Sequence, residues 1–571
     1  MPALSARAAR RRVVLRIASL TAAAALATFL AAATGARWAE SGRYAARSVM
    51  DRQAHRPLDP MLFVTGDRCM PCHNGLTAPS GADVSIGFDW RATIMANSSR
   101  DPYWQGSVRR EVLDHPTAQA KIEDECSICH MPMQRYQARA IGGRGLVFAR
   151  LPGKRGSDPL DSLAADGVSC TLCHQIQDER LGDTSSFTGG FVIDTAPPGN
   201  RRPVYGPYEI DRGHTTIMHS SSGFVPTRGM HIRESEMCAT CHTLYTTTLG
   251  PQGETMGHLP EQVPFLEWKH SAYAGERSCQ DCHMPPATAP GDSVPITVVL
   301  GHPRAGVREH TFAGGNFLVL GMLNRYRKEL AVEALPPELD AAVTSTKAML
   351  AQAARVKLEP QSAQEGEIAV DVVVTNLTGH KLPTAYPSRR AWLHVTVRDR
   401  NGKLVFESGA LMPTGRIVGN DNDDDRTKYE PHHREITRPD QVEIYEPILR
   451  DTRGRVTTGL LSSIGYLKDN RLLPRGFDKA TAAPDFAVVG DAASDPEFVD
   501  GSDRVRYRVD ARGTQGPFRV AAELWYQPIG FRWAHNLELQ PATETNRFVA
   551  YYESMAASSA VVLARDTLEL R

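Results

Sequence analysis

The clearest hydrophobic pattern lies in the C-terminal part of the chain, where apolar and polar positions alternate. Segments of this kind occupy residues 368–376, 392–397, 404–406, 504–509 and 518–524. Alternation with period two indicates half-buried antiparallel strands. Several such strands, separated by turn signals, predict an all-β, sandwich-like domain over residues 358–571.

Two segments ahead of this β domain have helical spacing. Residues 317–332 and 339–356 carry apolar residues three and four positions apart, and two prolines separate them. We expect them to form a helical connector over residues 315–357. The preceding stretch, 37–314, is rich in Gly, Pro, Ser and Thr and has few long periodic segments. It predicts irregular structure with short helices, one of them over 104–115.

The N-terminal segment has the pattern of an export signal. A cluster of Arg precedes an apolar run over residues 17–33, and small residues follow at 34–36. This order is typical of a signal peptide over residues 1–36, with cleavage after Ala36. An uncleaved membrane anchor is the alternative, because the run is only slightly short for a membrane span.

Composition and charge narrow the classes of function. The chain has 571 residues, 41% of them apolar, and its 65 basic side chains balance 65 acidic ones. This is the composition of a folded protein with more than one domain. Nucleic acid is not expected as a partner, because the sequence shows no basic excess.

The cysteines carry the strongest chemical signal. All ten lie in five copies of Cys-x-x-Cys-His, the attachment signature of c-type haem. Two thiols at this spacing reach both vinyl groups of one porphyrin, and the following imidazole becomes the proximal iron ligand. The sequence therefore predicts five covalent haems, held by Cys69, Cys72, Cys126, Cys129, Cys170, Cys173, Cys238, Cys241, Cys279 and Cys282, with iron ligands His73, His130, His174, His242 and His283.

Two other chemistries use paired cysteines. Zinc would join Cys-x-x-Cys units into four-ligand sites, but five units do not pair evenly and zinc does not require a His after each one. Redox disulfides would need a separate fold context for every motif. Both alternatives explain the pattern less well than haem.

Each haem iron has a second axial position, and fourteen other histidines are available to fill it. His231 and His310 lie in loops near the fourth and fifth motifs. His380 follows a strand, between Gly379 and a nearby proline. We expect these three, together with His214 and His219, to supply distal ligands. Met95 is a competing sixth ligand, with packing against porphyrin as its alternative role.

One acidic stretch has the alternating oxygens of a calcium loop. Asp421, Asp423 and Asp425 alternate, but the Gly and Glu of an EF-hand are not in place. Calcium is a hypothesis here, and a solvated acidic turn is its alternative.

Residues 69–310 resemble the multihaem cytochrome c family that includes the tetrahaem cytochrome of ammonia oxidisers, the pentahaem nitrite reductase and hydroxylamine oxidoreductase. The motif series carries this resemblance, with the strings Asp-Gly-Val-Ser-Cys-Thr-Leu-Cys-His-Gln at 166–175 and Ser-Cys-Gln-Asp-Cys-His-Met-Pro at 278–285. Segments 379–384, 466–474 and 526–533 are similar to a β domain of exported multihaem cytochromes. The resemblance implies haem binding more specifically than a reaction.

Two departures from that family bear on activity. The chain has no Cys-x-x-Cys-Lys motif, which the nitrite reductase uses at its catalytic haem, and it has fewer motifs than hydroxylamine oxidoreductase. Neither activity is therefore carried over.

These observations predict an exported pentahaem cytochrome that transfers electrons through mostly bis-His haems. We expect a periplasmic or extracellular location and redox partner proteins, either quinol-linked proteins or other cytochromes. One alternative is a reductase with an open haem, acting on a small nitrogen or sulfur species, with Lys381, Arg389, Arg390 or the pair His432 and His433 binding anion or delivering protons. Another is a subunit of an extracellular electron conduit.

Overall fold

The computed structural model describes residues 61–153, 158–197 and 201–571. Almost all of them belong to one compact unit, formed by Leu62–Arg155 and Leu160–Arg571. The predicted export segment, 1–36, lies outside the described residues. Within the described ranges, no helix is both long enough and apolar enough to cross a membrane.

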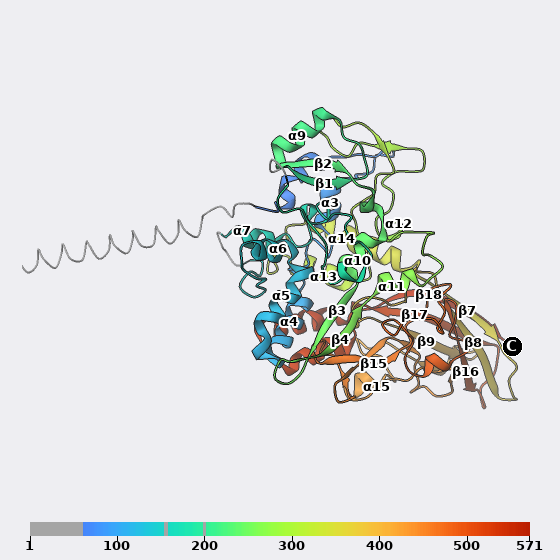
Figure 1. Cartoon of the computed structure of the whole chain (residues 1–571). Helices are drawn as coiled ribbons and strands as arrows, with labels where there is room; N and C mark the ends of the chain where they lie inside the picture. Colours follow the sequence, from blue (N-terminus) through green and yellow to red (C-terminus); the bar gives the residue numbers. More distant parts are fainter. Residues whose placement is uncertain (1–60, 154–157, 198–200) are drawn as a thin grey trace, which may run out of the picture. The chain divides into compact units, whose positions relative to one another are not determined.

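Short helices dominate the part of the chain that carries the motifs, here called the motif half (described residues up to 314). This agrees with the sequence prediction. The helices are α2 (Met70–His73), α3 (Ile86–Arg91), α4 (Pro102–Asp114), α5 (Gln119–His130), α6 (Pro132–Ala140), α7 (Pro159–Ala165), α8 (Cys170–Cys173), α9 (Arg212–Ser222), α10 (Ser235–His242), α11 (Pro264–Lys269) and α12 (Cys279–His283) (Figure 1).

Helix α4 matches the helix predicted at 104–115 but begins two residues earlier. Asp101 caps it, because its carboxylate accepts hydrogen bonds from the backbone N–H groups of Tyr103 and Trp104. Pro102 occupies the first helical position, where its missing N–H costs nothing.

The motif half also contains three small sheets that the sequence analysis did not predict. Strands β1 (Arg202–Gly206) and β2 (Phe224–Arg228) pair in parallel, with α9 between them in the chain. Two antiparallel pairs follow: β3 (Leu244–Leu249) with β4 (Thr255–Gln262), and β5 (Ser293–Val294) with β6 (Arg304–Ala305). These strands are short, and their sequences lack apolar alternation.

The connector contains two helices, α13 (Phe317–Arg325) and α14 (Pro336–Leu350). The helix predicted over 339–356 is wrong at its C-terminal end, because Ala354–Pro360 forms strand β7. Val356 and Leu358 of β7 are buried while Arg355 and Lys357 are exposed. This alternation fits a strand paired with β8, and tertiary packing overrides the helical spacing.

Residues 358–571, here called the β half, hold most of the strands, and all five segments predicted as strands are confirmed. One sheet has the order β10 (Leu404–Ser408), β9 (Arg390–Arg398), β17 (Phe518–Gln527), β18 (Val561–Leu570), with β12 (Ile444–Tyr445) also on β9. A second has the order β11 (Glu435–Ile436), β16 (Ser502–Asp510), β8 (Glu367–Asn376), β7. A third joins β14 (Val456–Thr457), β13 (Pro447–Asp451) and β15 (Ser463–Asp469).

The first two sheets share one hydrophobic core. Val372 of β8, Val395 of β9, Val505 of β16 and Val520 of β17 are fully buried in a single cluster. Alternate residues of each strand face this cluster, as in a β-sandwich, and along β16 the intervening residues are Arg504, Arg506 and Arg508. This half therefore buries a continuous core of its own side chains.

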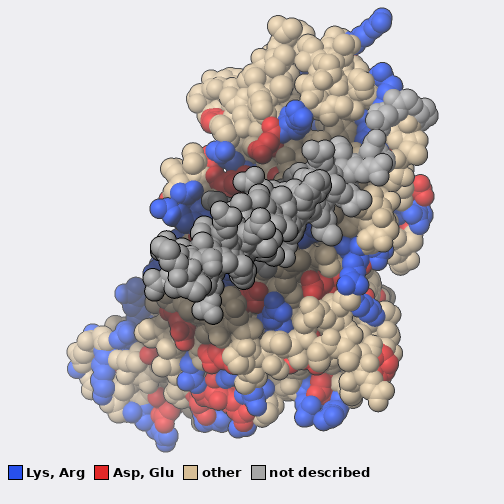
Figure 2. Space-filling view, turned by 90° about the vertical axis from the view of Figure 1, so that its left-hand side faces the viewer, with Lys and Arg blue, Asp and Glu red and all other residues tan. Residues whose placement is uncertain are grey.

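Helix α17 (Thr543–Met555) joins the two halves by packing on α4. Gly106 of α4 lets the helices approach, because a Cβ there would meet the side chains of Leu537 and Phe548 at 3.2 and 3.6 Å. The Arg109 guanidinium pairs with the Glu544 carboxylate at 2.8 Å. On the face shown in Figure 2, basic and acidic side chains intermingle, most densely in the lower part of the view.

Candidate haem sites

All five motifs open onto one cavity. Its volume is about 2420 Å³, and its wall includes every motif cysteine and every motif histidine. Pockets for a single small ligand measure roughly 300–1,000 Å³, so this space accommodates several large groups. Nine of the ten cysteines are half-buried, Cys282 is exposed, and all ten line this cavity.

Each Cys-x-x-Cys segment forms a helical turn: four lie within α5, α8, α10 and α12, and the first begins at Cys69, the N-cap of α2. In a helix, residues three and four apart share one face, so the two thiols and the following imidazole point the same way. In α12, Ser278 and Asp281 form a capping box that fixes the start of the turn. The local fold thus presents two thiols and one imidazole together, as a covalent haem requires.

Four motif imidazoles are oriented by the backbone. The Nδ1 atoms lie at 2.6 to 3.0 Å from carbonyl oxygens, pairing His73 with Ile296, His130 with Ser98, His174 with Tyr205 and His283 with Ala313. Metal-ligating histidines usually donate their second nitrogen in this way, which leaves Nε2 for the metal. The indole of Trp104 also stacks on His130, with ring centroids 4.4 Å apart.

Two of the predicted distal ligands face motif imidazoles. The ring centroids of His174 and His310 are 6.4 Å apart with planes at 18°, and those of His283 and His380 are 6.3 Å apart at 15°. A metal bound by two imidazoles at about 2 Å each, with each centroid about 1.1 Å behind its nitrogen, gives a separation near this value. Both pairs therefore leave room for one iron between them.

The two distal candidates also have the orientation of ligands. The Nδ1 atoms of His310 and His380 lie 3.1 and 2.8 Å from the carbonyl oxygens of Arg308 and Lys381. In the described part of the chain, no hydrogen bond involves their Nε2 atoms. Burial lowers the pKa of both imidazoles to about 4, so both rings are neutral at neutral pH.

A buried ionic network holds the loop that carries His380. The Glu267 carboxylate of α11 accepts a hydrogen bond from Thr384 Oγ1 at 2.5 Å and pairs with the Arg471 guanidinium at 2.9 Å. Asp469 pairs with both Arg471 and Lys381, at 2.8 and 2.7 Å. The β half thus carries His380 into the cavity wall, while α11 of the motif half anchors its loop.

The other three predicted distal ligands occupy different environments. His231 is buried, with Nε2 2.9 Å from the carbonyl oxygen of Ile176, and it is not part of the cavity wall. His219 lies on α9 and is also absent from that wall. His214 lines the cavity, but both its nitrogens have partners, the Asp211 carboxylate at 2.5 Å and the Leu300 carbonyl oxygen at 3.0 Å.

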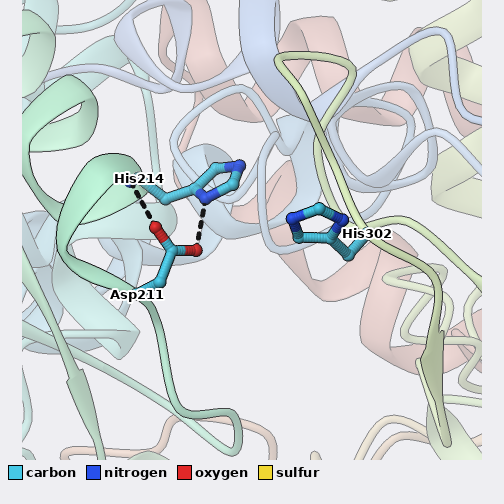
Figure 3. A group of neighbouring side chains, drawn as sticks. All are labelled: Asp211, His214 and His302. Atoms are coloured by element: carbon cyan, nitrogen blue, oxygen red, sulfur yellow. Dashed lines mark hydrogen bonds and ion pairs between the residues drawn. The ribbon is translucent and has the colours of Figure 1, made fainter.

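His302 is a cavity residue that the sequence analysis did not rank. Its ring lies 5.5 Å from that of His214, centroid to centroid, beside Asp211 (Figure 3). The loop before it covers the first motif, because Val298 donates its backbone N–H to the Cys72 carbonyl oxygen. In the sequence, the only sign of a role for His302 was its place in a loop near other histidines.

Thiols of different motifs adjoin one another. Three pairs are close enough for each thiol to shift the pKa of the other: Cys69 with Cys170, Cys129 with Cys241, and Cys238 with Cys279. Charge on Cys241 also raises the pKa of Cys173, after the larger effect of burial. The first site therefore adjoins the third, and the fourth adjoins the second, third and fifth.

A polar patch interrupts the cavity wall near the second motif. The rings of Tyr103 and Tyr386 meet edge to face with centroids 5.7 Å apart, and Glu111 and Glu261 line the same wall as the Cys126 thiol. Burial raises the pKa of both Glu side chains to about 7. Met95, the competing ligand, also lines the cavity.

Most residues proposed from the sequence for anion binding are already paired. Lys381 pairs with Asp469 and Arg390 with Asp423, all four buried, and only Arg389 lines the cavity. His432 is buried in a separate cluster of carboxylates. The partners of Lys381 and Arg390 lie 88 and 33 positions away in the sequence, so the sequence analysis did not reveal them.

The acidic stretch does not form a shared cation site. Asp423 is bound by Arg390, Asp424 pairs with Arg416, and Asp425 accepts hydrogen bonds from Thr427. Asp421 and Asp424 belong to a single helical turn, α15 (Asp421–Asp424). The carboxylates thus point to separate partners, and the calcium hypothesis is not supported.

No protein-family model matches the chain, and no curated protein matches it. Among solved structures, it is similar to a penta-heme cytochrome c552 from Thermochromatium tepidum. The identity is 16%, the match covers 90% of this chain and 100% of that chain, and the TM-score is 0.48. A similarity of this degree assigns no function by itself.

Proposed function

We propose that the protein is an exported pentahaem c-type cytochrome that carries electrons between redox proteins. One observation carries the proposal: a single cavity, lined by all fifteen Cys and His residues of the five motifs, holds two imidazole pairs at the spacing of a bis-His iron site. The haems would supply the redox centres, and the chain's own residues attach, orient and enclose them.

The neighbouring thiols support a continuous path for electrons. Sites that share adjoining cysteines bring their cofactors within short range of one another. The first site adjoins the third, and the third adjoins the fourth. The second and fifth sites both adjoin the fourth, so all five sites are connected. Such a branched chain favours a carrier that accepts electrons at one end and delivers them at another.

Distal ligation is proposed site by site. His310 ligates the haem of the third motif, and His380 that of the fifth. For the first motif we propose an imidazole from the pair His214 and His302, which borders the loop covering it. His219 and His231 stay predictions, because no motif imidazole faces either ring within the described ranges.

Spectroscopy of the mature holoprotein tests this proposal. Mass spectrometry is expected to give five covalent haems per chain. In H310A and H380A, one low-spin ferric EPR signal each is expected to disappear, with a new high-spin haem that binds CO after reduction. The matched control is H394A, because His394 is bonded to Glu407 on a strand of the β half. Fewer than five haems, or spectra unchanged in both variants, would contradict the proposal.

A second candidate function is reduction of a small nitrogen or sulfur species at the haem of the second motif. The polar patch favours it, because Tyr103, Tyr386 and Glu261 place proton donors beside this site. None of the ring pairs found among residues 61–153, 158–197 and 201–571 sets a second imidazole opposite His130. Stoichiometric CO binding to the reduced wild-type protein would favour this reductase, and no CO binding would exclude it for the resting state.

A further inference from the structure

Four segments of the β half bring one imidazole and three carboxylates together, apart from the haem cavity. The side chains of His432, Glu443 and Asp495 are at most 1% exposed, and Asp503 on β16 is equally buried. None of the four belongs to the cavity wall. The haem proposal makes no use of this cluster.

Three of these side chains offer donor atoms to a common point. One ligand atom each from His432, Asp495 and Asp503 lies within 4.8 Å of the others. The Nε2 atom of His432 is 3.1 Å from the Asp495 carboxylate. The edges between neighbouring ligands of a metal at about 2.1 Å measure about 3 Å, so this spacing is compatible with shared coordination.

Each donor is also held by a second set of groups. The Nδ1 atom of His432 lies 2.8 Å from the Glu443 carboxylate, and the Tyr445 hydroxyl donates to Asp503 at 2.7 Å. The backbone N–H of Glu497 donates to Asp495 at 2.8 Å. A carboxylate behind a ligating imidazole is the usual outer support of a metal site.

Three buried carboxylates, those of Glu443, Asp495 and Asp503, surround the His432 imidazole. Besides the imidazole, the facing cations are Arg434, which is half exposed and 3.4 Å from Asp495, and Lys479, whose amine bonds the carbonyl oxygens of Ala492 and Asp495. Buried carboxylates are either paired with cations or coordinate a metal ion, and metal analysis distinguishes these two states of the cluster.

We propose that His432, Asp495 and Asp503 bind a divalent first-row transition cation such as Zn²⁺. One nitrogen and two carboxylate oxygens suit such an ion, whereas calcium prefers oxygen ligands alone. The site is closed to solvent, so the cation has a structural role. It ties His432 to the segment 495–503, about sixty residues further along the chain.

Metal analysis of the full, haem-loaded protein tests this inference. After equilibration with Zn²⁺ and removal of free ion, wild type is expected to hold about one non-haem metal per chain, and a chelator is expected to lower its melting temperature. D503N should lose the metal, and its melting temperature should no longer respond to the chelator. E443Q, which changes only the outer support of His432, should weaken binding about 10- to 100-fold.

The matched control is D491N, because Asp491 is an exposed carboxylate four residues from Asp495. It should retain the metal and the chelator response. If D503N fails to fold, a second measurement on the wild type tests the inference. Adding Zn²⁺ back after chelation should restore the melting temperature. A wild type that binds no non-haem metal overturns the inference, as does equal binding in D503N and D491N. In that case His432 is an imidazolium paired with Glu443 and Asp495. The haem spectrum is a separate readout, so this result leaves the proposed function untouched.

Discussion

The two halves of this chain reach a folded state in different ways. In the β half, two sheets enclose one large cluster of fully buried side chains, including Val372, Val395 and Val520. In the motif half, the hydrophobic clusters are smaller and separate, and their centre is a cavity of about 2420 Å³. One half buries its own side chains, while the other encloses space for groups that the polypeptide does not provide.

The difference also shows in the polar interior. The β half buries complete ion pairs, such as Lys381 with Asp469, whose side chains are 0% and 2% exposed. The cavity wall of the motif half carries instead the ten motif cysteines and the five motif histidines. This comparison predicts that the two halves depend on haem to very different degrees.

The largest expected effect follows from preventing haem attachment. In a chain expressed without the haem maturation system, the motif half should lose its central contacts, while the β half keeps its own core. We expect limited proteolysis to cleave the motif half at least about tenfold faster than in the holoprotein, with a β-half fragment persisting, because cleavage follows the population of open states. Equal protection of both halves with and without haem would remove the distinction drawn here.

The next effect concerns the ionic network that joins the halves. In R471M, the carboxylates of Glu267 and Asp469 lose a partner that is 5% exposed. Breaking a buried pair by removing one partner costs about 3–5 kcal/mol. The loss should appear in denaturant unfolding, and the haem facing His380 should show altered EPR because its loop is released.

The control for that variant is R475M. Arg475 and Glu276 also bridge the two halves, but their side chains are 53% and 55% exposed. Exposed pairs of this kind contribute about 0–1 kcal/mol. If R471M and R475M destabilise the protein equally, burial is not what gives the network its strength.

A third prediction concerns pH. Burial, together with the nearby Glu111 carboxylate, raises the pKa of Glu261 from 4.5 to about 7. The folded state then binds more protons than the unfolded state between these values, so stability falls as pH rises from about 4.5 to 7. E261Q should flatten this dependence by up to about 3 kcal/mol. Denaturant unfolding across this pH range measures it.

The control variant for the pH prediction is E209Q, because the Glu209 side chain is 80% exposed. It should leave the slope of stability against pH as in the wild type. A slope that persists in E261Q would assign the titration to other groups, Glu111 foremost, whose pKa is also raised to about 7 by burial.

Sequence patterns predicted the β half better than the motif half. The alternation along β8, β9, β16 and β17 was visible because each strand has one face in a protein core. The pair β3 and β4 was not, because its strands are largely polar and flank the cavity rather than a core of side chains. Where a cofactor replaces the core, hydrophobic periodicity carries little information.

The same limit applies to the site. Covalent attachment requires a fixed local spacing, so the motif residues could be read directly from the sequence. The proposed distal ligands come from remote segments, and only the fold sets His380 opposite His283 and His310 opposite His174. His231 had an equally favourable sequence context, yet its ring bonds a backbone carbonyl outside the cavity wall.

The smallest predicted effect tests the joint between the halves. Arg109 of α4 pairs with Glu544 of α17 through two hydrogen bonds and lies 3.5 Å from the centre of the Phe148 ring. Its side chain is 22% exposed, so R109M should cost only about 1 kcal/mol, measured by denaturant unfolding. R139M is the control, since Arg139 is 57% exposed and should matter less. A single unfolding transition retained in R109M would mean that the network around Arg471 couples the halves. Two separated transitions would mean that the contact of α4 with α17 couples them instead.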